Sequence, residues 1–503
     1  MTLVLTPSSK ISLLNSGPTT KIILTIIVTT ILVLIPLMSS SIYRSSAALQ
    51  NGENASIVLG QPNFTSSYSG ENQSGLAGPE GIAIDSKGDV WISDSQNNRV
   101  LEFLPPFSNG ENASLVIGQQ NFSTFSCETP SLSTLCDPQG LAFDKSGDLF
   151  VADNGNNRVL DFEPPFTDGE PAGVSIGEAL NATTSFSLNS PIGVALDSSN
   201  DLWVADEGNQ RVLEFAAPVF TNESASVVIG QTNFVSNSSG ANQSGLNSPD
   251  QITFDHSGDL WVSDSGNSRV LEFRAPLRTG EIADVVIGQP NFTSTLQGPT
   301  QSVFSVPSGL VFDSEGNLWV ADTFNGRVLQ FVPPFYNGEN ASLVIGKTGF
   351  NSTETLSTQS LLAAPEGVAF DPSGSLWVLD TGSNRALEFA VSGNFSTQAS
   401  LETTASESAA SSFTTFTGSF EFSTTSSNVS SVSIARTSSI STSASTSEVS
   451  STQSTTALPI TTSHSHSASL LSYLATLTAL VFVSLALFIV AVRRRSNRPR
   501  TPT

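Results

Sequence analysis

A long motif that recurs six times constrains the fold of this 503-residue chain more than any other feature. The first copy reads PEGIAIDSKGDVWISDSQNNRVLEF and begins at Pro79. The six copies start at nearly even intervals, at Pro79, Pro138, Pro191, Pro249, Pro307 and Pro365. Repetition of this kind indicates that one supersecondary unit is used again and again, with each unit packing on its neighbours.

Each copy predicts four short β-strands. Apolar runs with alternating polarity are separated by turn residues such as the Asp85–Gly88 stretch. In the first copy the runs are residues 81–84, 90–93, 99–103 and 113–117. Four antiparallel strands at a fixed period are typical of a β-propeller blade.

The order of the strands also predicts how the ring closes. A fourth run follows each of the first five copies, but none follows the sixth. A matching run, residues 55–60, instead precedes the first copy. We therefore expect an all-β, six-bladed propeller in which this N-terminal strand completes the last blade, so that no strand edge of the ring stays unpaired.

The repeat resembles the NHL repeat. The shared pattern is P-x-G-(I/V/L)-A-x-D-x-x-G-(D/N)-L-W-V-(A/S)-D-x-x-N-x-R-V-L-E-F, over about residues 55–390. Gln251 departs from it in the fourth copy, where Gly is usual, and Ser383 departs in the sixth, where Asn is usual. The resemblance implies a propeller fold. Proteins with such repeats include RNA-binding domains, sensor domains of receptor kinases and a few lyases.

The most conspicuous polar residues recur in every copy, which favours a structural role. Each copy carries an Asp that we expect to cap a turn and pair with a nearby Arg. The six pairs are Asp94/Arg99, Asp153/Arg158, Asp206/Arg211, Asp264/Arg269, Asp322/Arg327 and Asp380/Arg385. One large aromatic per copy is expected to pack between neighbouring blades: Trp91, Phe150, Trp203, Trp261, Trp319 and Trp377.

The two ends of the chain predict membrane attachment. Residues 22–38 are apolar and follow Lys10 and Lys21, so residues 1–48 hold either a secretory signal peptide or an uncleaved signal anchor. The remaining segments are the propeller (50–392), a disordered Ser/Thr-rich stalk (393–468), a transmembrane helix (469–492) and a basic tail (493–503). The arginines of that tail place it in the cytoplasm, so the propeller is expected outside the cell.

An extracellular location sets two further expectations. Cys127 and Cys136 should form a local disulfide. Candidate glycosylation sites, each an N-x-S/T sequence, are Asn54, Asn63, Asn72, Asn112, Asn121, Asn181, Asn222, Asn237, Asn242, Asn291, Asn340 and Asn351.

Charge argues against nucleic acid as a partner. Acidic residues outnumber basic ones 44 to 20, for a net charge of −24. Apart from the repeat arginines, the predicted propeller has only Lys87, Lys145, Arg274, Arg278 and Lys347. A nucleic-acid binder needs a basic face to neutralise phosphates, and these residues are too few to build one.

The sequence favours a binding module over an enzyme. Of three histidines only His256 lies in the propeller, no unrepeated acidic cluster stands out, and no cofactor is predicted, although a structural calcium in the central channel stays open. We therefore expect a membrane-anchored ectodomain that recognises an extracellular protein or glycan through the loops between blades. Tyr68 and Phe125 are the candidate contacts, because the recurring Phe of those loops should pack inward. The alternative is a metal-dependent propeller hydrolase or lyase that acts on a small extracellular substrate.

Overall fold

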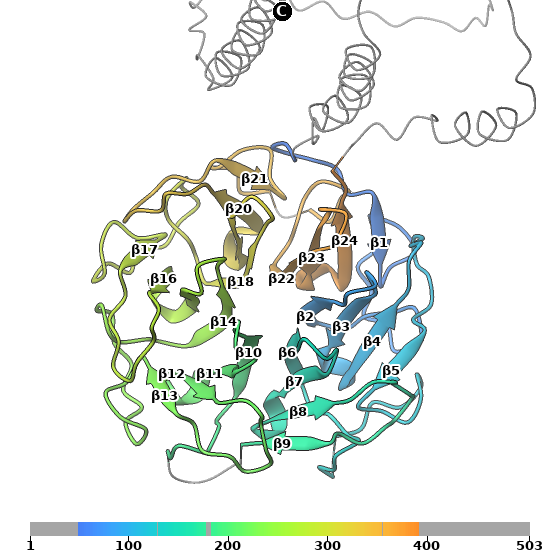
Figure 1. Cartoon of the computed structure of the whole chain (residues 1–503). Coiled ribbons are helices and arrows are strands. Elements are labelled where there is room, and N and C mark those ends of the chain that lie inside the picture. Colours follow the sequence, from blue (N-terminus) through green and yellow to red (C-terminus); the bar gives the residue numbers. More distant parts are fainter. Residues whose placement is uncertain (1–48, 128, 178–182, 355, 392–503) are drawn as a thin grey trace, which may run out of the picture. The chain divides into compact units, whose positions relative to one another are not determined.

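The computed structural model describes residues 49–127, 129–177, 183–354 and 356–391, which form six four-stranded antiparallel sheets arranged as a ring (Figure 1). Blade 1 contains β2 (Pro79–Ile84), β3 (Val90–Asp94), β4 (Arg99–Phe103) and β5 (Leu115–Ile117). Blade 2 contains β6 (Pro138–Phe143), β7 (Leu149–Asp153), β8 (Arg158–Phe162) and β9 (Val174–Ile176). Blade 3 contains β10 (Pro191–Leu196), β11 (Leu202–Asp206), β12 (Arg211–Phe215) and β13 (Val227–Ile229).

The second half of the ring repeats this arrangement. Blade 4 contains β14 (Pro249–Phe254), β15 (Leu260–Asp264), β16 (Arg269–Phe273) and β17 (Val285–Ile287). Blade 5 contains β18 (Pro307–Phe312), β19 (Leu318–Asp322), β20 (Arg327–Phe331) and β21 (Leu343–Ile345). Blade 6 contains β22 (Pro365–Phe370), β23 (Leu376–Asp380), β24 (Arg385–Phe389) and β1 (Ile57–Leu59).

The predicted closure of the ring is confirmed. β1 pairs antiparallel with β24, with Val58 opposite Leu387, and the sixth sheet has the order β1-β24-β23-β22. The two ends of the propeller therefore share one sheet, as the missing fourth strand of the last repeat predicted.

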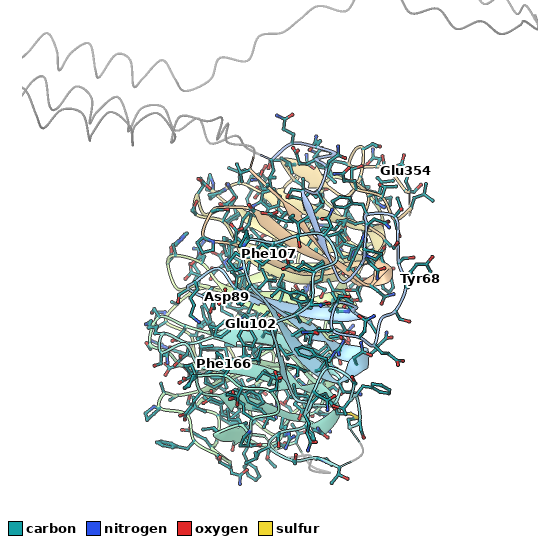
Figure 2. The ribbon with its side chains drawn as sticks, turned by 90° about the vertical axis from the view of Figure 1, so that its right-hand side faces the viewer. Tyr68, Asp89, Glu102, Phe107, Phe166 and Glu354 are labelled. Atoms are coloured by element: carbon teal, nitrogen blue, oxygen red, sulfur yellow. A yellow bond between two sulfur atoms is a disulfide. The ribbon has the colours of Figure 1, made fainter. Side chains whose placement is uncertain are left out.

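Each blade has two ends that face opposite sides of the ring. A short 3₁₀ helix joins the second and third strands at one end, which we call the η face: η1 (Ser95–Asn97), η2 (Asn154–Asn156), η3 (Glu207–Asn209), η4 (Ser265–Asn267), η5 (Thr323–Asn325) and η6 (Thr381–Ser383). The β-turn between the first and second strands, such as residues 85–88, lies at the other end, which we call the hairpin face. Loops between blades, with Tyr68 and Glu354, lie along one side of the ring seen edge-on, away from Asp89 (Figure 2).

The core lies between neighbouring sheets. Trp91 of blade 1 is fully buried in a cluster with Leu149 and Val151 of blade 2, and its ring makes an edge contact with Phe143 at 5.7 Å. Trp377 occupies the same place between blades 6 and 1. Each blade therefore buries its apolar face only when the next blade is present, which is why the ring folds as one unit.

The membrane segments predicted from the sequence lie outside the described residues, as do the stalk and the basic tail. Among the residues that the structure describes, no helix combines the length and apolar character needed to cross a bilayer.

Candidate active site

The six Asp–Arg pairs form buried ion pairs inside their own blades. In blade 3 the Arg211 Nε lies 2.7 Å from Asp206 Oδ2, and both side chains are fully buried. The same guanidinium donates to the carbonyls of Phe234, Thr184 and Ser187, at 2.6, 2.8 and 2.8 Å. The other five pairs are joined in the same way. These side chains hold loops to strands and do not converge on a cavity.

The inner strands of all six blades surround an axial channel. The close approach of these strands requires the glycine of the repeat. A Cβ on Gly81 would lie 2.0 Å from the Gln139 carbonyl oxygen of blade 2, and one on Gly309 would lie 2.0 Å from the Glu366 carbonyl oxygen of blade 6. Blade 4 has Gln251 at this position, and its side chain lines the channel.

A cavity of about 270 Å³ forms the mouth of this channel on the η face. Residues from every blade line it, because each inner strand begins there. The residue after each repeat's first proline faces this mouth: Glu80, Gln139, Ile192, Asp250, Ser308 and Glu366. Side chains of the η turns, among them Asn154, Glu207 and Phe324, complete the rim.

Three of these residues are carboxylates that share one small space. Burial, followed by the charges of Glu80, Asp250 and Asp137, raises the pKa of Glu366. Burial and the charge of Asp137 also raise the pKa of Glu80. Burial raises the pKa of Asp250 to about 7, although a hydrogen bond of 2.9 Å donated by the Ser308 hydroxyl opposes the shift.

This group of carboxylates lacks a compensating charge among its neighbours. The side chains that line the mouth include no Lys, Arg or His. Buried like charges without a counter-charge are costly, and a bound cation removes that cost. The oxygens of three carboxylates and of the Gln139 and Gln251 amides are the donors that Ca²⁺, Mg²⁺ or Mn²⁺ prefers. The residues present fit such a cation better than zinc, which usually takes His or Cys ligands.

The residues predicted from the sequence lie elsewhere. Tyr68 and Phe125 are exposed, at 76% and 46%, and neither lines the channel mouth. Cys127 and Cys136 form a disulfide in the loop before blade 2. The Phe residues that recur in the loops pack against the core, as Phe64 and Phe122 illustrate. His256 lies at a turn of the hairpin face, where its Nδ1 faces Gly316 of the next blade.

The expectation that the chain has no unrepeated acidic cluster is wrong. Glu80, Asp250 and Glu366 occupy one position of the repeat, whose other residues are Gln, Ile and Ser. That variability inside an otherwise regular motif is the signal that the sequence offers. The constant positions of the repeat do not reveal a site that is built from its variable position.

Comparison with known proteins supports the assignment of the repeat. The family model described as "NHL repeat" matches residues 76–103, 135–162, 188–215 and 304–331. These ranges coincide with blades 1, 2, 3 and 5. The repeats predicted from the sequence are therefore confirmed as NHL repeats.

Two curated relatives carry the names of enzymes. The chain is 31% identical over 156 residues to peptidylglycine alpha-amidating monooxygenase of Rattus norvegicus, covering 30% of this chain and 15% of that protein. It is 32% identical over 137 residues to peptidyl-alpha-hydroxyglycine alpha-amidating lyase 2 of Drosophila melanogaster, covering 27% and 30%. The chain therefore matches less than a third of either relative's length.

Similar solved structures include virginiamycin B lyase from Staphylococcus aureus, with 14% identity, a TM-score of 0.39 and coverage of 62% of this chain and 94% of that one. A gluconolactonase from Xanthomonas campestris gives 15% identity, a TM-score of 0.41 and coverage of 63% and 87%. Likeness at this level adds nothing to the assignment of function.

These findings correct the functional expectation drawn from the sequence. A surface module that binds a protein or glycan without catalysis is contradicted, because the curated relatives are named as enzymes. The physical reason for the error is that the carboxylates of the channel mouth are far apart in sequence and meet only when the ring closes.

Proposed function

Because this chain is a six-bladed β-propeller of NHL repeats, we propose that it is a divalent-cation-dependent lyase or hydrolase whose active site is the mouth of the axial channel. The observation that carries the proposal is the convergence of Glu80, Asp250 and Glu366, from three different blades, in one cavity without a basic side chain. Similarity to a relative named as a lyase supports an enzyme of this class.

The carboxylates of Glu80, Asp250 and Glu366 would hold the cation, and the amide oxygens of Gln139 and Gln251 complete the set of hard donors. When bound, such a cation polarises a carbonyl or hydroxyl oxygen of the substrate as a Lewis acid. The chain itself orients these donors. The Ser308 hydroxyl fixes the Asp250 carboxylate through a hydrogen bond of 2.9 Å, and Ser308 is held in turn by a hydrogen bond from Ser263 to its carbonyl.

The rim of the mouth suggests what else the substrate contains. Phe324 of η5 is 73% exposed and lines the cavity. The equivalent residue of the other five η turns is Gln96, Gly155, Gly208, Gly266 or Gly382. A single aromatic beside the oxygen donors favours a small substrate that carries both a carbonyl or hydroxyl group and an apolar group. A cavity of about 270 Å³ is too small for a folded protein to enter.

A turnover assay on the purified full chain tests this proposal. The chain is stripped with chelator and reloaded separately with Ca²⁺, Mg²⁺ or Mn²⁺. It is then assayed against a peptide ending in α-hydroxyglycine, chosen from the name of the lyase relative, and against small aliphatic and aromatic lactones. We expect turnover of one substrate class that disappears on chelation and returns with one of the cations.

Matched variants locate that activity. Glu80→Gln and Glu366→Gln preserve shape and remove charge at the mouth, so each should abolish turnover, whereas Glu71→Gln changes an exposed acid outside the cavity and should have no effect. Phe324→Ala should raise KM for aromatic substrates with little change in kcat. Turnover that persists in the Glu80→Gln/Glu366→Gln double variant would refute the proposed site.

A further inference from the structure

A second set of carboxylates lies at the hairpin face, at the opposite end of the inner strands from the channel mouth. Its positions are the Asp that opens the β-turn, the residue that ends the turn, and one residue of the third strand, and all three are acidic in blades 1 to 4. In blade 3 these are Asp197, Asp201 and Glu214, and in blade 4 they are Asp255, Asp259 and Glu272. We call each group a hairpin triad.

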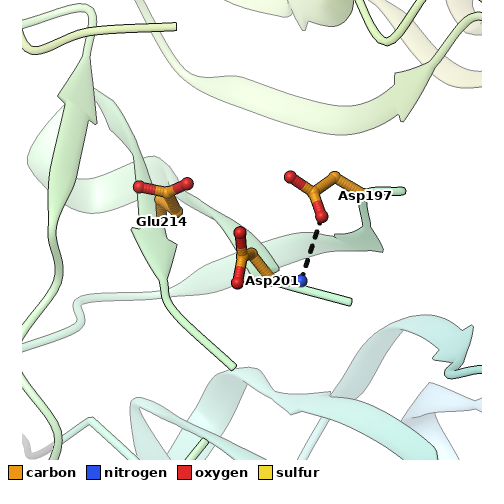
Figure 3. A group of neighbouring side chains, drawn as sticks. All are labelled: Asp197, Asp201 and Glu214. Atoms are coloured by element: carbon orange, nitrogen blue, oxygen red, sulfur yellow. Dashed lines mark hydrogen bonds between the residues drawn. The ribbon is translucent and has the colours of Figure 1, made fainter. Parts of the chain in front are cut away.

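In blades 3 and 4 the three carboxylates converge. One oxygen from each side chain lies within 4.8 Å of the others. Figure 3 shows the three side chains of blade 3. Backbone amides orient the two aspartates. Asp197 Oδ1 accepts from the amides of Ser199 and Asp201, at 2.7 and 3.0 Å, and Asp201 Oδ1 accepts from the Ala217 amide at 2.7 Å. These bonds all use Oδ1, so the turn presents the aspartates in a fixed orientation.

A buried and unsatisfied oxygen provides an independent indication of a ligand. The Glu272 side chain is only 7% exposed, and its Oε2 has no hydrogen-bond partner among the described residues. The Arg274 NH2 lies 3.7 Å away, beyond hydrogen-bond distance, on a side chain that is 59% exposed. A buried carboxylate oxygen without a donor is costly, and a cation at the triad would satisfy it.

Other blades satisfy the equivalent glutamate with their own atoms. A serine hydroxyl donates to Glu102 in blade 1 and to Glu214 in blade 3, from Ser114 and Ser226, and Ser56 donates to Glu388 in blade 6 at 2.7 Å. In blade 4 the residue equivalent to these serines is Asp284, which supplies no hydroxyl. Among the described residues, Glu272 therefore lacks the hydrogen bond that these three counterparts receive.

We infer that the hairpin triad of blade 4 binds a divalent cation of the calcium class. Three carboxylates presented by a turn and an adjacent strand supply hard oxygen ligands, and Ca²⁺ tolerates the irregular geometry that such a site offers. The site lies at the far end of the blade from the channel mouth and is independent of the proposed catalytic cation. Its role would be to hold the β-turn against the third strand.

Terbium luminescence tests this inference on the full chain. Tb³⁺ replaces Ca²⁺ and emits when a nearby tryptophan is excited. Trp261 Nε1 lies 3.5 Å from Asp255 Oδ2, and Trp203 is paired with Glu214 across the strands. We expect tryptophan-sensitised emission that excess Ca²⁺ displaces. The Glu272→Gln variant should lose most of this emission, whereas Glu214→Gln changes the hydrogen-bonded carboxylate of blade 3 and should retain it.

Two further variants keep the outcome unambiguous. Glu80→Gln/Glu366→Gln alters only the channel mouth and should retain the Ca²⁺-displaceable emission. A negative result for the proposed active site can therefore be distinguished from a negative result for the hairpin triad. Asn317→Asp/Gln330→Glu/Ser342→Asp gives blade 5 the acidic residues of blade 4 beside Trp319 and should increase the emission. The inference is overturned if emission is unchanged in the folded Glu272→Gln protein, or if that protein does not fold and the blade 5 variant shows no increase.

Discussion

Individual buried polar residues of this propeller fall into two groups that differ in whether their charge is compensated. The aspartates of the Asp–Arg pairs are fully buried, yet each has a guanidinium within hydrogen-bond distance. The acids of the channel mouth are half-buried, and the charges nearest to them are those of other acids. The charge of the first group is therefore compensated within the fold, whereas the second group reduces the stability of the fold until a cation binds.

The first prediction concerns the Arg211–Asp206 pair. Arg211→Met should lower the free energy of unfolding by about 3–5 kcal/mol, because it leaves the Asp206 carboxylate buried without its partner. Denaturant titration of the full chain measures this change. Arg278→Met, at an exposed site, should stay within about 0.5 kcal/mol of the parent. Equal effects of the two substitutions would contradict a structural role for the repeat arginine.

The second prediction is a pH dependence set by Glu80 and Glu366. Their pKa values rise from 4.5 to about 8 and about 9 on folding. A carboxyl group with a raised pKa in the folded state favours folding at low pH, and this contribution is lost as the pH rises toward the folded pKa. In chelator, the Tm should therefore fall between about pH 5 and 9, and Glu366→Gln should make that fall shallower. A Tm that rises across this range in the parent would be the opposite result.

Within each inner strand, the constant positions of the repeat build the fold, whereas the variable position lies at the proposed site. The glycine of the inner strand in every blade but the fourth permits close approach between blades, since a Cβ on Gly81 would lie 2.0 Å from the Gln139 carbonyl oxygen. The neighbouring position is free to vary, because its side chain points into the channel mouth instead of between strands. Blade 4 departs at both positions, with Asp250 and Gln251.

A third prediction compares the same strand position in two blades. Gly81→Ala should lower the free energy of unfolding by about 1–3 kcal/mol, since its new Cβ collides with the Gln139 carbonyl. Gln251→Gly restores the usual residue and should leave stability nearly unchanged while weakening cation binding at the mouth. Thermal unfolding and a cation titration of both variants measure these effects. Tolerance of Gly81→Ala would indicate that the inner strands are less tightly packed than described.

The sequence predicted the strands and the closure of the ring well, because local alternation and turn residues repeat in every blade. The sequence also predicted the pairing of each Asp with its Arg, because the two residues are close together in the sequence and lie on adjacent strands. The candidate active site could not be predicted in this way. Glu80 and Glu366 are 286 positions apart in the sequence and meet only because β1 and β24 share a sheet. The spacing of these two residues along the chain does not indicate that contact.

In the whole molecule, six similar blades form a ring whose η face and hairpin face differ in their chemistry. The η face gathers one position of the repeat around the axis, so residues that differ between blades meet in one cavity. The hairpin face keeps its carboxylate clusters in separate blades, as in blades 3 and 4. A propeller can therefore gather residues of one repeat position at its axis while it keeps residues of other positions in separate blades.

A fourth prediction follows for the stability of the ring. Cations that bind only the folded chain should raise its stability by about 2.7 kcal/mol at a concentration of 100 times the Kd for each site. Differential scanning calorimetry of the chelated chain should show a Tm that climbs with Ca²⁺ concentration. The increase should shrink in Glu80→Gln/Glu366→Gln and shrink further when the hairpin triad of blade 4 is also neutralised. A Tm insensitive to divalent cations at pH 8 would argue against both of these sites.

The divalent cation that we propose at the axis of the ring, held by three carboxylates from separate blades, can be located directly. Anomalous diffraction from crystals of the chain grown with Mn²⁺ tests for it. We expect a peak at the channel mouth within coordinating distance of Glu80, Asp250 and Glu366. A mouth without a peak at saturating Mn²⁺, or one in which these three carboxylates point away from each other, would contradict it.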